Sequence, residues 1–136
     1  MSATLISIVG PPAAGKTTLA EGLCRRLPGR MIREDYRGNP FLAASYVGRR
    51  EARLPSQLYF LVSRTGQLAA ARFPDEGVYV SDYGYCQDRV YAEARLDAAD
   101  LAVYAAAADR LAGLVRPADL TVILDAEIDA LRDRIA

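Results

Sequence analysis

The chain has 136 residues, of which 51% are apolar and 25% are charged, and its formal net charge is zero. This composition predicts one globular domain, residues 1–136, and gives no electrostatic reason to expect a nucleic-acid or membrane partner. The sequence has no histidine, which excludes His-based acid–base chemistry and His metal ligands. Two cysteines without CxxC spacing and no membrane-length apolar run favour a reducing, cytoplasmic location.

Short apolar runs typical of buried strands alternate along the chain with segments of helical periodicity. Repeated strand–helix alternation predicts a parallel sheet with right-handed crossovers, and therefore a three-layer α/β/α domain with about four strands and helices on both faces. In chain order, we expect a strand at 4–9, a helix at 16–27, a strand at 30–34, a helix starting at 39, a helix at 55–73, a strand at 77–82, a helix within 84–96, a helix at 97–115, a strand at 119–125 and a helix from 127.

The stretch GPPAAGKTT lies between the first strand and the first helix. A phosphate cradle needs glycines for a tight turn, a helix N-terminus behind it, a lysine for the β and γ oxygens and a hydroxyl for Mg²⁺. The glycines have the required spacing, and the lysine of this stretch is the only one in the chain. The stretch therefore predicts a phosphate-binding P-loop. Its residues are Gly10, Pro11, Pro12, Ala13, Ala14, Gly15, Lys16, Thr17 and Thr18.

Two acids, Glu34 and Asp82, follow the second and third predicted strands. In an open parallel sheet the ligand lies beyond the carboxyl ends of the strands. A carboxylate placed there can hold Mg²⁺ through water or accept the proton of an attacking hydroxyl. For either acid alone, a helix cap or a surface charge is an equally good interpretation.

The helix that starts near Pro55 carries Gln57 and Arg64 on one face, with Phe60 and Leu61 between them. An amide, a guanidinium and an aromatic ring along one stripe can flank a flat heterocycle, and a glutamine amide pairs with both donors and acceptors on a base edge. Taken alone, the stripe is better explained as a partly exposed helix face with a core-facing phenylalanine.

The chain resembles the deoxynucleoside kinase family of P-loop enzymes. The matching segments occur in the family's order: GPPAAGKTT, RE ending at Glu34, NPFLAASY, PSQLYFLVSR, VSDYGYCQDRVYA and DLTVILDA. The P-loop is generic, whereas NPFL…Y followed by QLYFLVSR is more specific. The resemblance implies a P-loop NTPase fold and Mg²⁺-dependent transfer of the ATP γ-phosphate to the 5′-hydroxyl of a (deoxy)nucleoside in nucleotide salvage. Because these kinases are commonly dimeric, it also implies a homodimer.

The resemblance implies roles for the acceptor side. Glu34 resembles the general base for the 5′-hydroxyl, Tyr46 the tyrosine that binds the sugar 3′-hydroxyl, and Gln57 the glutamine that reads the base edge. Arg64 and Asp88 resemble the pair that faces the base and helps to separate purines from pyrimidines.

On the donor side, Lys16 and the loop amides would hold the γ-phosphate, and Thr17 and Asp82 would hold Mg²⁺, partly through water. The expected reaction is in-line transfer, in which the protein positions the reactants and stabilises charge.

Two departures from the family bear on catalysis. Tyr83 stands where the family usually has an arginine beside the transferring phosphate, and Arg89 is only near it in sequence. The sequence ends at LRDRIA, where the family continues into an arginine-rich lid and a fifth strand, so we expect a truncated member whose fourth strand is an exposed edge.

Two other functions remain open. A nucleoside monophosphate kinase of the thymidylate kinase type needs basic residues for the acceptor phosphate. A nucleotide-binding remnant with little or no catalysis is consistent with Tyr83 and the missing lid. The residues that keep the first alternative open are Arg37, Arg49, Arg50 and Arg53.

Overall fold

The computed structural model describes residues 3–135, and these divide into two compact units. Unit 1 comprises residues 3–34, 74–84 and 117–135, and unit 2 comprises residues 35–73 and 85–116. The single domain expected from the composition stays a prediction.

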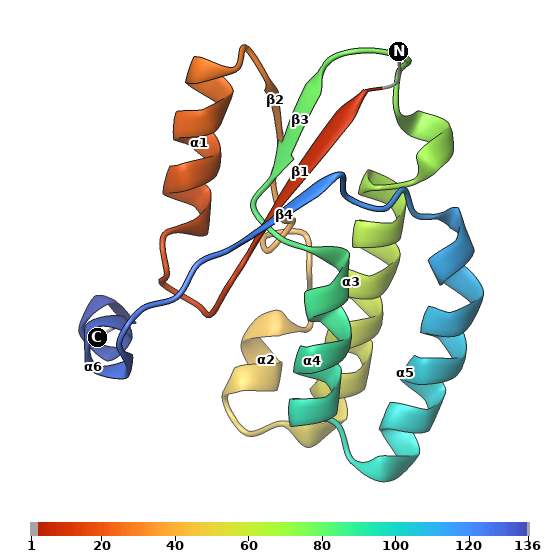
Figure 1. Ribbon diagram of the computed structural model, residues 1–136. Coiled ribbons are helices and arrows are strands. Elements are labelled where there is room, and N and C mark those ends of the chain that lie inside the picture. Colours follow the sequence, from red (N-terminus) through yellow and green to blue (C-terminus); the bar gives the residue numbers. More distant parts are fainter. Residues whose placement is uncertain (1–2, 136) are drawn as a thin grey trace. The chain divides into compact units, whose positions relative to one another are not determined.

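Unit 1 is built on a parallel sheet of four strands in the order β2-β3-β1-β4 (Figure 1). Strand β1 lies in the interior of the sheet and is buried from Leu5 to Val9, which explains its unbroken apolar sequence. The four strands end in the same direction, so the residues that follow them gather at one edge, as the sequence predicted. The strands are β1 (Thr4–Val9), β2 (Arg30–Ile32), β3 (Val78–Ser81) and β4 (Leu120–Ile123).

The core of unit 1 joins helix α1 (Lys16–Arg26) to the sheet. Ala20 in α1 is fully buried against Ile8 and Val80 of the two inner strands. A small side chain at this position lets the helix approach the sheet closely, which fixes the direction of the helix N-terminus.

Strand β4 forms one edge of the sheet, as predicted for the fourth strand. Its side chains are largely exposed, with Leu120 at 54% and Ile123 at 75% of full exposure. Helix α6 (Ile128–Ile135) follows it in unit 1.

Unit 2 is helical, and α3, α4 and α5 lie side by side (Figure 1). Its core is formed by Leu61, Ala92, Leu96 and Tyr104, which are all buried. The helices are α2 (Leu42–Tyr46), α3 (Arg53–Gln67), α4 (Tyr85–Arg95) and α5 (Ala98–Leu111), with single 3₁₀ turns at Arg50–Ala52, Ala70–Arg72 and Ala112–Leu114.

Two of the helix boundaries that differ from the prediction have a clear cause in hydrogen bonding. Helix α3 ends at Gln67 instead of residue 73, because the Leu68 carbonyl accepts a hydrogen bond from the Arg116 amide at 2.8 Å and Ala69 bridges to Val115. Helix α2 starts after Asn39, because the Asn39 side chain accepts from the Phe41 amide at 3.0 Å and thus forms a turn. The observed strands and helices otherwise follow the predicted order and confirm the α/β class.

No helix within residues 3–135 is long and apolar enough to cross a bilayer.

Candidate functional site

The segment from Gly10 to Gly15 forms a loop that leads into the N-terminus of α1, and Lys16, Thr17 and Thr18 are the first residues of that helix. Gly15 precedes the helix with a φ of 98°, in the left-handed region that favours glycine. A Cβ at Gly10 would lie 2.7 Å from the Leu124 carbonyl oxygen, so only glycine fits there. The first turn of α1 has no acidic residue of its own that would offset the positive end of the helix dipole. The loop thus has the geometry and the field of an anion site.

Lys16 is the first residue of α1, and its ammonium folds back over the loop. Its Nζ donates to the carbonyl oxygens of Gly10 at 2.8 Å and Pro11 at 2.9 Å. An ammonium has three donors, and these two bonds hold it above the loop, where it faces any anion bound by the backbone amides.

The Asp82 carboxylate connects the helix that follows the loop with the end of β2. The Thr17 hydroxyl donates to Asp82 Oδ2 at 2.9 Å, and the Glu34 backbone amide donates to Oδ1 at 3.0 Å. The structure therefore brings three predicted site residues from separate parts of unit 1 to one point.

Burial raises the pKa of the Asp82 carboxyl above its usual range. The Thr17 hydroxyl and the nearby positive charges of Arg33 and Lys16 act in the opposite direction. A bound cation would relieve this cost, because it favours the ionised carboxylate.

The donor set at this point fits Mg²⁺. A hydroxyl oxygen and a carboxylate oxygen lie 2.9 Å apart at the start of a phosphate loop, and Mg²⁺ prefers oxygen ligands shared between a protein and phosphates. Thr17 and Asp82 would hold the ion, with water completing its shell.

Tyr83 occupies the position where the resemblance expected an arginine. Its side chain is 1% exposed, and its carbonyl accepts from the Ser81 hydroxyl at 2.6 Å. A buried phenol supplies no positive charge. Arg89, the nearby arginine in sequence, pairs with Asp109 at 3.2 Å on the surface of unit 2.

The structure places one further cation at the loop that the sequence analysis missed. Arg134, in the last turn of α6, donates from Nη1 to the Ala13 carbonyl at 2.9 Å. The two residues are 121 positions apart, so no local sequence signal could have revealed the contact.

In unit 2, α3 presents the predicted stripe as a buried face. Gln57, Phe60, Leu61 and Arg64 are all at most 7% exposed. The Gln57 side chain is only 4% exposed, so its amide is a polar group placed on the buried face of α3.

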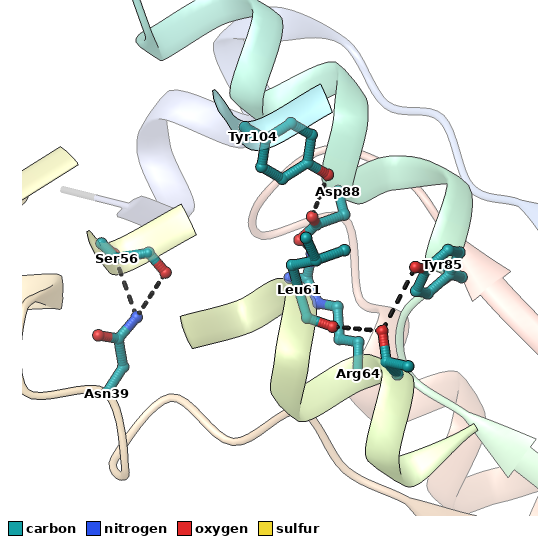
Figure 2. Close-up of polar contacts among 8 residues, drawn as sticks. Asn39, Ser56, Leu61, Arg64, Tyr85, Asp88 and Tyr104 are labelled. Atoms are coloured by element: carbon teal, nitrogen blue, oxygen red, sulfur yellow. Dashed lines mark hydrogen bonds and ion pairs between the residues drawn. The ribbon is translucent and has the colours of Figure 1, made fainter. Parts of the chain in front are cut away.

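Arg64 and Asp88 form a buried ion pair, drawn in Figure 2. Arg64 Nη1 donates to Asp88 Oδ1, and the guanidinium carbon lies 4.9 Å from the centre of the Phe60 ring. The pair predicted from the resemblance is thus present as a contact, while its role toward a base stays a prediction.

Tyr104 of α5 completes this group, because its phenol donates to Asp88 Oδ2 (Figure 2). Burial and the adjacent carboxylate raise the pKa of Tyr104 well above its usual range, so the phenol remains a donor. The sequence analysis missed Tyr104, although it is the only aromatic residue in an alanine-rich helix.

Tyr46 lies apart from this buried group, at the end of α2. It is 70% exposed, and the Arg95 guanidinium stacks 4.4 Å from its ring centre. Arg95 also donates to the Ser45 carbonyl at 2.8 Å, which anchors the end of α2.

A parallel sheet with a glycine-rich loop between β1 and α1, followed by Lys16 and Thr17, defines the P-loop NTPase class. The model of the deoxynucleoside kinase family matches residues 6–136. The chain belongs to the deoxynucleoside kinase family.

Two curated proteins are similar in sequence. Deoxyguanosine kinase of Bacillus subtilis (strain 168) is 33% identical over 106 residues, which cover 76% of this chain and 51% of that protein. A tRNA dimethylallyltransferase of Nitratidesulfovibrio vulgaris (strain DP4) is 30% identical over 90 residues, which cover 63% of this chain and 29% of that protein. The chain therefore spans about half the length of the deoxyguanosine kinase that it matches.

Solved structures of deoxyadenosine kinase from M. mycoides share the fold. The complex with the products dCMP and dCDP has a TM-score of 0.80 and 21% identity, and covers 97% of this chain and 68% of that one. The complex with dATP has a TM-score of 0.78 and 22% identity, and covers 97% and 69%. These matches confirm the P-loop NTPase fold expected from the sequence.

Proposed function

We propose that the protein catalyses ATP-dependent transfer of the γ-phosphate to the 5′-hydroxyl of a deoxynucleoside. Family membership supports the class of reaction. The observation that carries the proposal is the Asp82 carboxylate, which joins the Thr17 hydroxyl beside the P-loop to the backbone of Glu34.

Unit 1 holds the donor in this proposal. The loop amides and the Lys16 ammonium bind the β- and γ-phosphates, and Thr17 and Asp82 hold Mg²⁺. When bound, Mg²⁺ neutralises charge that develops on the phosphate oxygens. The Arg134 guanidinium, at the Ala13 carbonyl, adds positive charge at the same loop.

Glu34 is the proposed general base. As the new P–O bond to the acceptor 5′-oxygen forms and the bond to the β-phosphate oxygen of ATP breaks, the hydroxyl proton passes to the Glu34 carboxylate. The hydrogen bond from the Glu34 amide to Asp82 at 3.0 Å fixes the backbone of this base next to the metal ligand.

Unit 2 selects the acceptor. The buried Gln57 amide would bind the base edge, the Arg64–Asp88 pair would face the base, and Tyr46 would reach the sugar 3′-hydroxyl. These assigned roles favour a nucleoside over a nucleoside monophosphate as the acceptor. The arginines that would favour a monophosphate acceptor (Arg37, Arg49 and Arg50) are exposed, and Arg53 is partly buried.

Cytoplasmic location, a role in nucleotide salvage and a homodimer follow from the same proposal, by analogy with the family.

The test measures formation of nucleoside monophosphate from Mg-ATP with deoxyguanosine, deoxyadenosine, deoxycytidine and thymidine, and with thymidine monophosphate as a further acceptor. Replacement of Glu34 with Gln is expected to lower kcat by about 10²-fold or more. The matched control is Glu21→Gln, a surface acid of unit 1 that pairs with Arg33 at 3.0 Å, and it should leave kcat unchanged.

Equal rates for Glu34→Gln and wild type would overturn the general-base role. ATP binding without any product in the wild type would favour the nucleotide-binding remnant, and product from thymidine monophosphate alone would favour the monophosphate kinase.

A further inference from the structure

The Asp88 carboxylate has both oxygens occupied within the helical unit. Oδ1 accepts from Arg64 of α3, and Oδ2 accepts from the Tyr104 phenol of α5. Asp88 itself lies on α4, so three helices meet at one carboxylate (Figure 2). All three side chains are at most 6% exposed.

Two partners on two oxygens fix the rotation of a carboxylate, whereas one partner leaves it free to turn. The hydrogen bond from Tyr104 therefore fixes the plane of the Asp88 carboxyl group. The position of Oδ1, which accepts from Arg64, is fixed with it. The Phe60 ring, 4.9 Å from the guanidinium carbon, supports the same orientation of Arg64.

The second hydrogen bond also bears on charge. Burial raises the pKa of the Asp88 carboxyl, and Arg64 and Tyr104 oppose that shift because both favour the ionised form. Without the Tyr104 phenol, the ionised Asp88 carboxylate would keep Arg64 as its side-chain donor at a buried position. The protonated form of Asp88 would then be more populated.

We propose that Tyr104 is a positioning residue for base selectivity: its phenol fixes the orientation of the Asp88 carboxyl group, so that Arg64 presents a fixed guanidinium to the acceptor base. The inference rests on the proposed function, because it takes the Arg64–Asp88 pair as the part of the protein that faces the base. Tyr104 does not touch the acceptor and acts through Asp88.

The test compares Tyr104→Phe with Tyr85→Phe in the whole chain. Both substitutions remove one phenol oxygen from unit 2. The Tyr85 hydroxyl contacts Thr65 Oγ1 at 3.3 Å, whereas the Asp88 oxygens accept from Arg64 and Tyr104, so Tyr85 is a matched control (Figure 2). Melting temperature verifies that each variant is folded, and calorimetry gives Kd for deoxyguanosine and deoxycytidine.

Tyr104→Phe is expected to change the ratio of the two Kd values by about tenfold, and Tyr85→Phe by less than about twofold, since one lost hydrogen bond to a charged group has about that effect. The acidic limb of the Kd–pH profile should also move to higher pH in Tyr104→Phe. The groups around Asp88 that bear on this limb are Arg64 from α3, Tyr104 from α5 and Tyr85 near Tyr104. In Asp88→Asn the limb should disappear, which assigns it to Asp88.

Equal weakening of both nucleosides in Tyr104→Phe, with an unmoved pH profile, would show a merely structural residue and overturn the inference. Binding of both nucleosides without phosphoryl transfer would count against the proposed catalysis alone, and the Kd ratio would still decide the role of Tyr104. A wild type that binds neither nucleoside would overturn both.

Discussion

The two units hold the charged side chains of their candidate sites with different partners. In unit 1, Lys16 is held by two backbone carbonyls, and Asp82 by one hydroxyl and one backbone amide. In unit 2, Asp88 is held entirely by side chains, from two other helices.

In the proposed function, this difference would separate a site that every acceptor uses from one that distinguishes acceptors. Backbone groups present the same donors and acceptors whatever the side chains are, which suits the phosphates common to all nucleotides. Side chains from three helices can be exchanged one at a time, which suits recognition of a variable base. Variants in unit 1 should therefore affect all acceptors equally, and variants in unit 2 should change the preference among them.

The largest effect is expected for Lys16→Ala. Removing the ammonium above the loop should lower kcat by about 10²–10³-fold, by the same factor for every nucleoside, because it stabilises charge on the transferring phosphate. Initial rates with saturating Mg-ATP measure this effect. Lys16→Arg is the control and should not restore activity, since a planar guanidinium cannot replace a compact ammonium above the carbonyls of Gly10 and Pro11. A loss of kcat with one nucleoside alone would contradict the proposal that unit 1 acts equally on all acceptors.

A loss of about 10²-fold in kcat is expected for Asp82→Asn, accompanied by a gain in stability. Because burial raises the pKa of this carboxyl in the folded state, ionisation opposes folding. The stability of the wild type therefore falls as the pH rises through the folded-state pKa, while an amide does not ionise and still accepts from the Glu34 amide.

Thermal unfolding from pH 3 to pH 8 checks the sign of this effect. The melting temperature of Asp82→Asn should exceed that of the wild type near neutral pH, and the two curves should converge below the unfolded-state pKa of about 4. A variant less stable than the wild type at pH 7 would contradict the effect of burial.

A smaller effect, confined to the acceptor, is expected for Gln57→Leu. The Gln57 amide is a polar group at a position only 4% exposed, so an apolar side chain of similar size should preserve or raise the melting temperature. The KM for the preferred nucleoside should rise by about tenfold while the KM for ATP stays constant. Gln67→Leu, at the last residue of the same helix, should leave both KM values unchanged. An equal rise in the KM for the nucleoside and the KM for ATP would contradict the proposed roles of unit 2 in acceptor binding and unit 1 in ATP binding.

The contrast between the units also explains how far the sequence could predict the site. The P-loop is contiguous, and its glycines, Lys16 and Thr17 follow from the local requirements of a phosphate cradle. The common location of Glu34 and Asp82 was also predictable, because the residues that follow parallel strands lie at the same edge of the sheet. The alternation of strands and helices predicted the fold class for the same reason.

The remaining parts depended on tertiary structure. Tyr104 joins Asp88 across 16 residues and two helices, and Arg134 reaches Ala13 across 121 residues, so neither partner is visible in local sequence. The early end of α3 has a similar cause, since the bond from Arg116 to Leu68 ends the helix where the local sequence still favoured one.

The β4 edge of the sheet has a consequence for the surface of unit 1. Within residues 3–135, strand β4 pairs with β1 alone, and the side chains of Leu120 and Ile123 are exposed. An edge of this kind is a template for an extended segment, whether from this chain or from another. Substitution of Leu120 or Ile123 would therefore change the surface of this edge without altering the buried cluster of either unit.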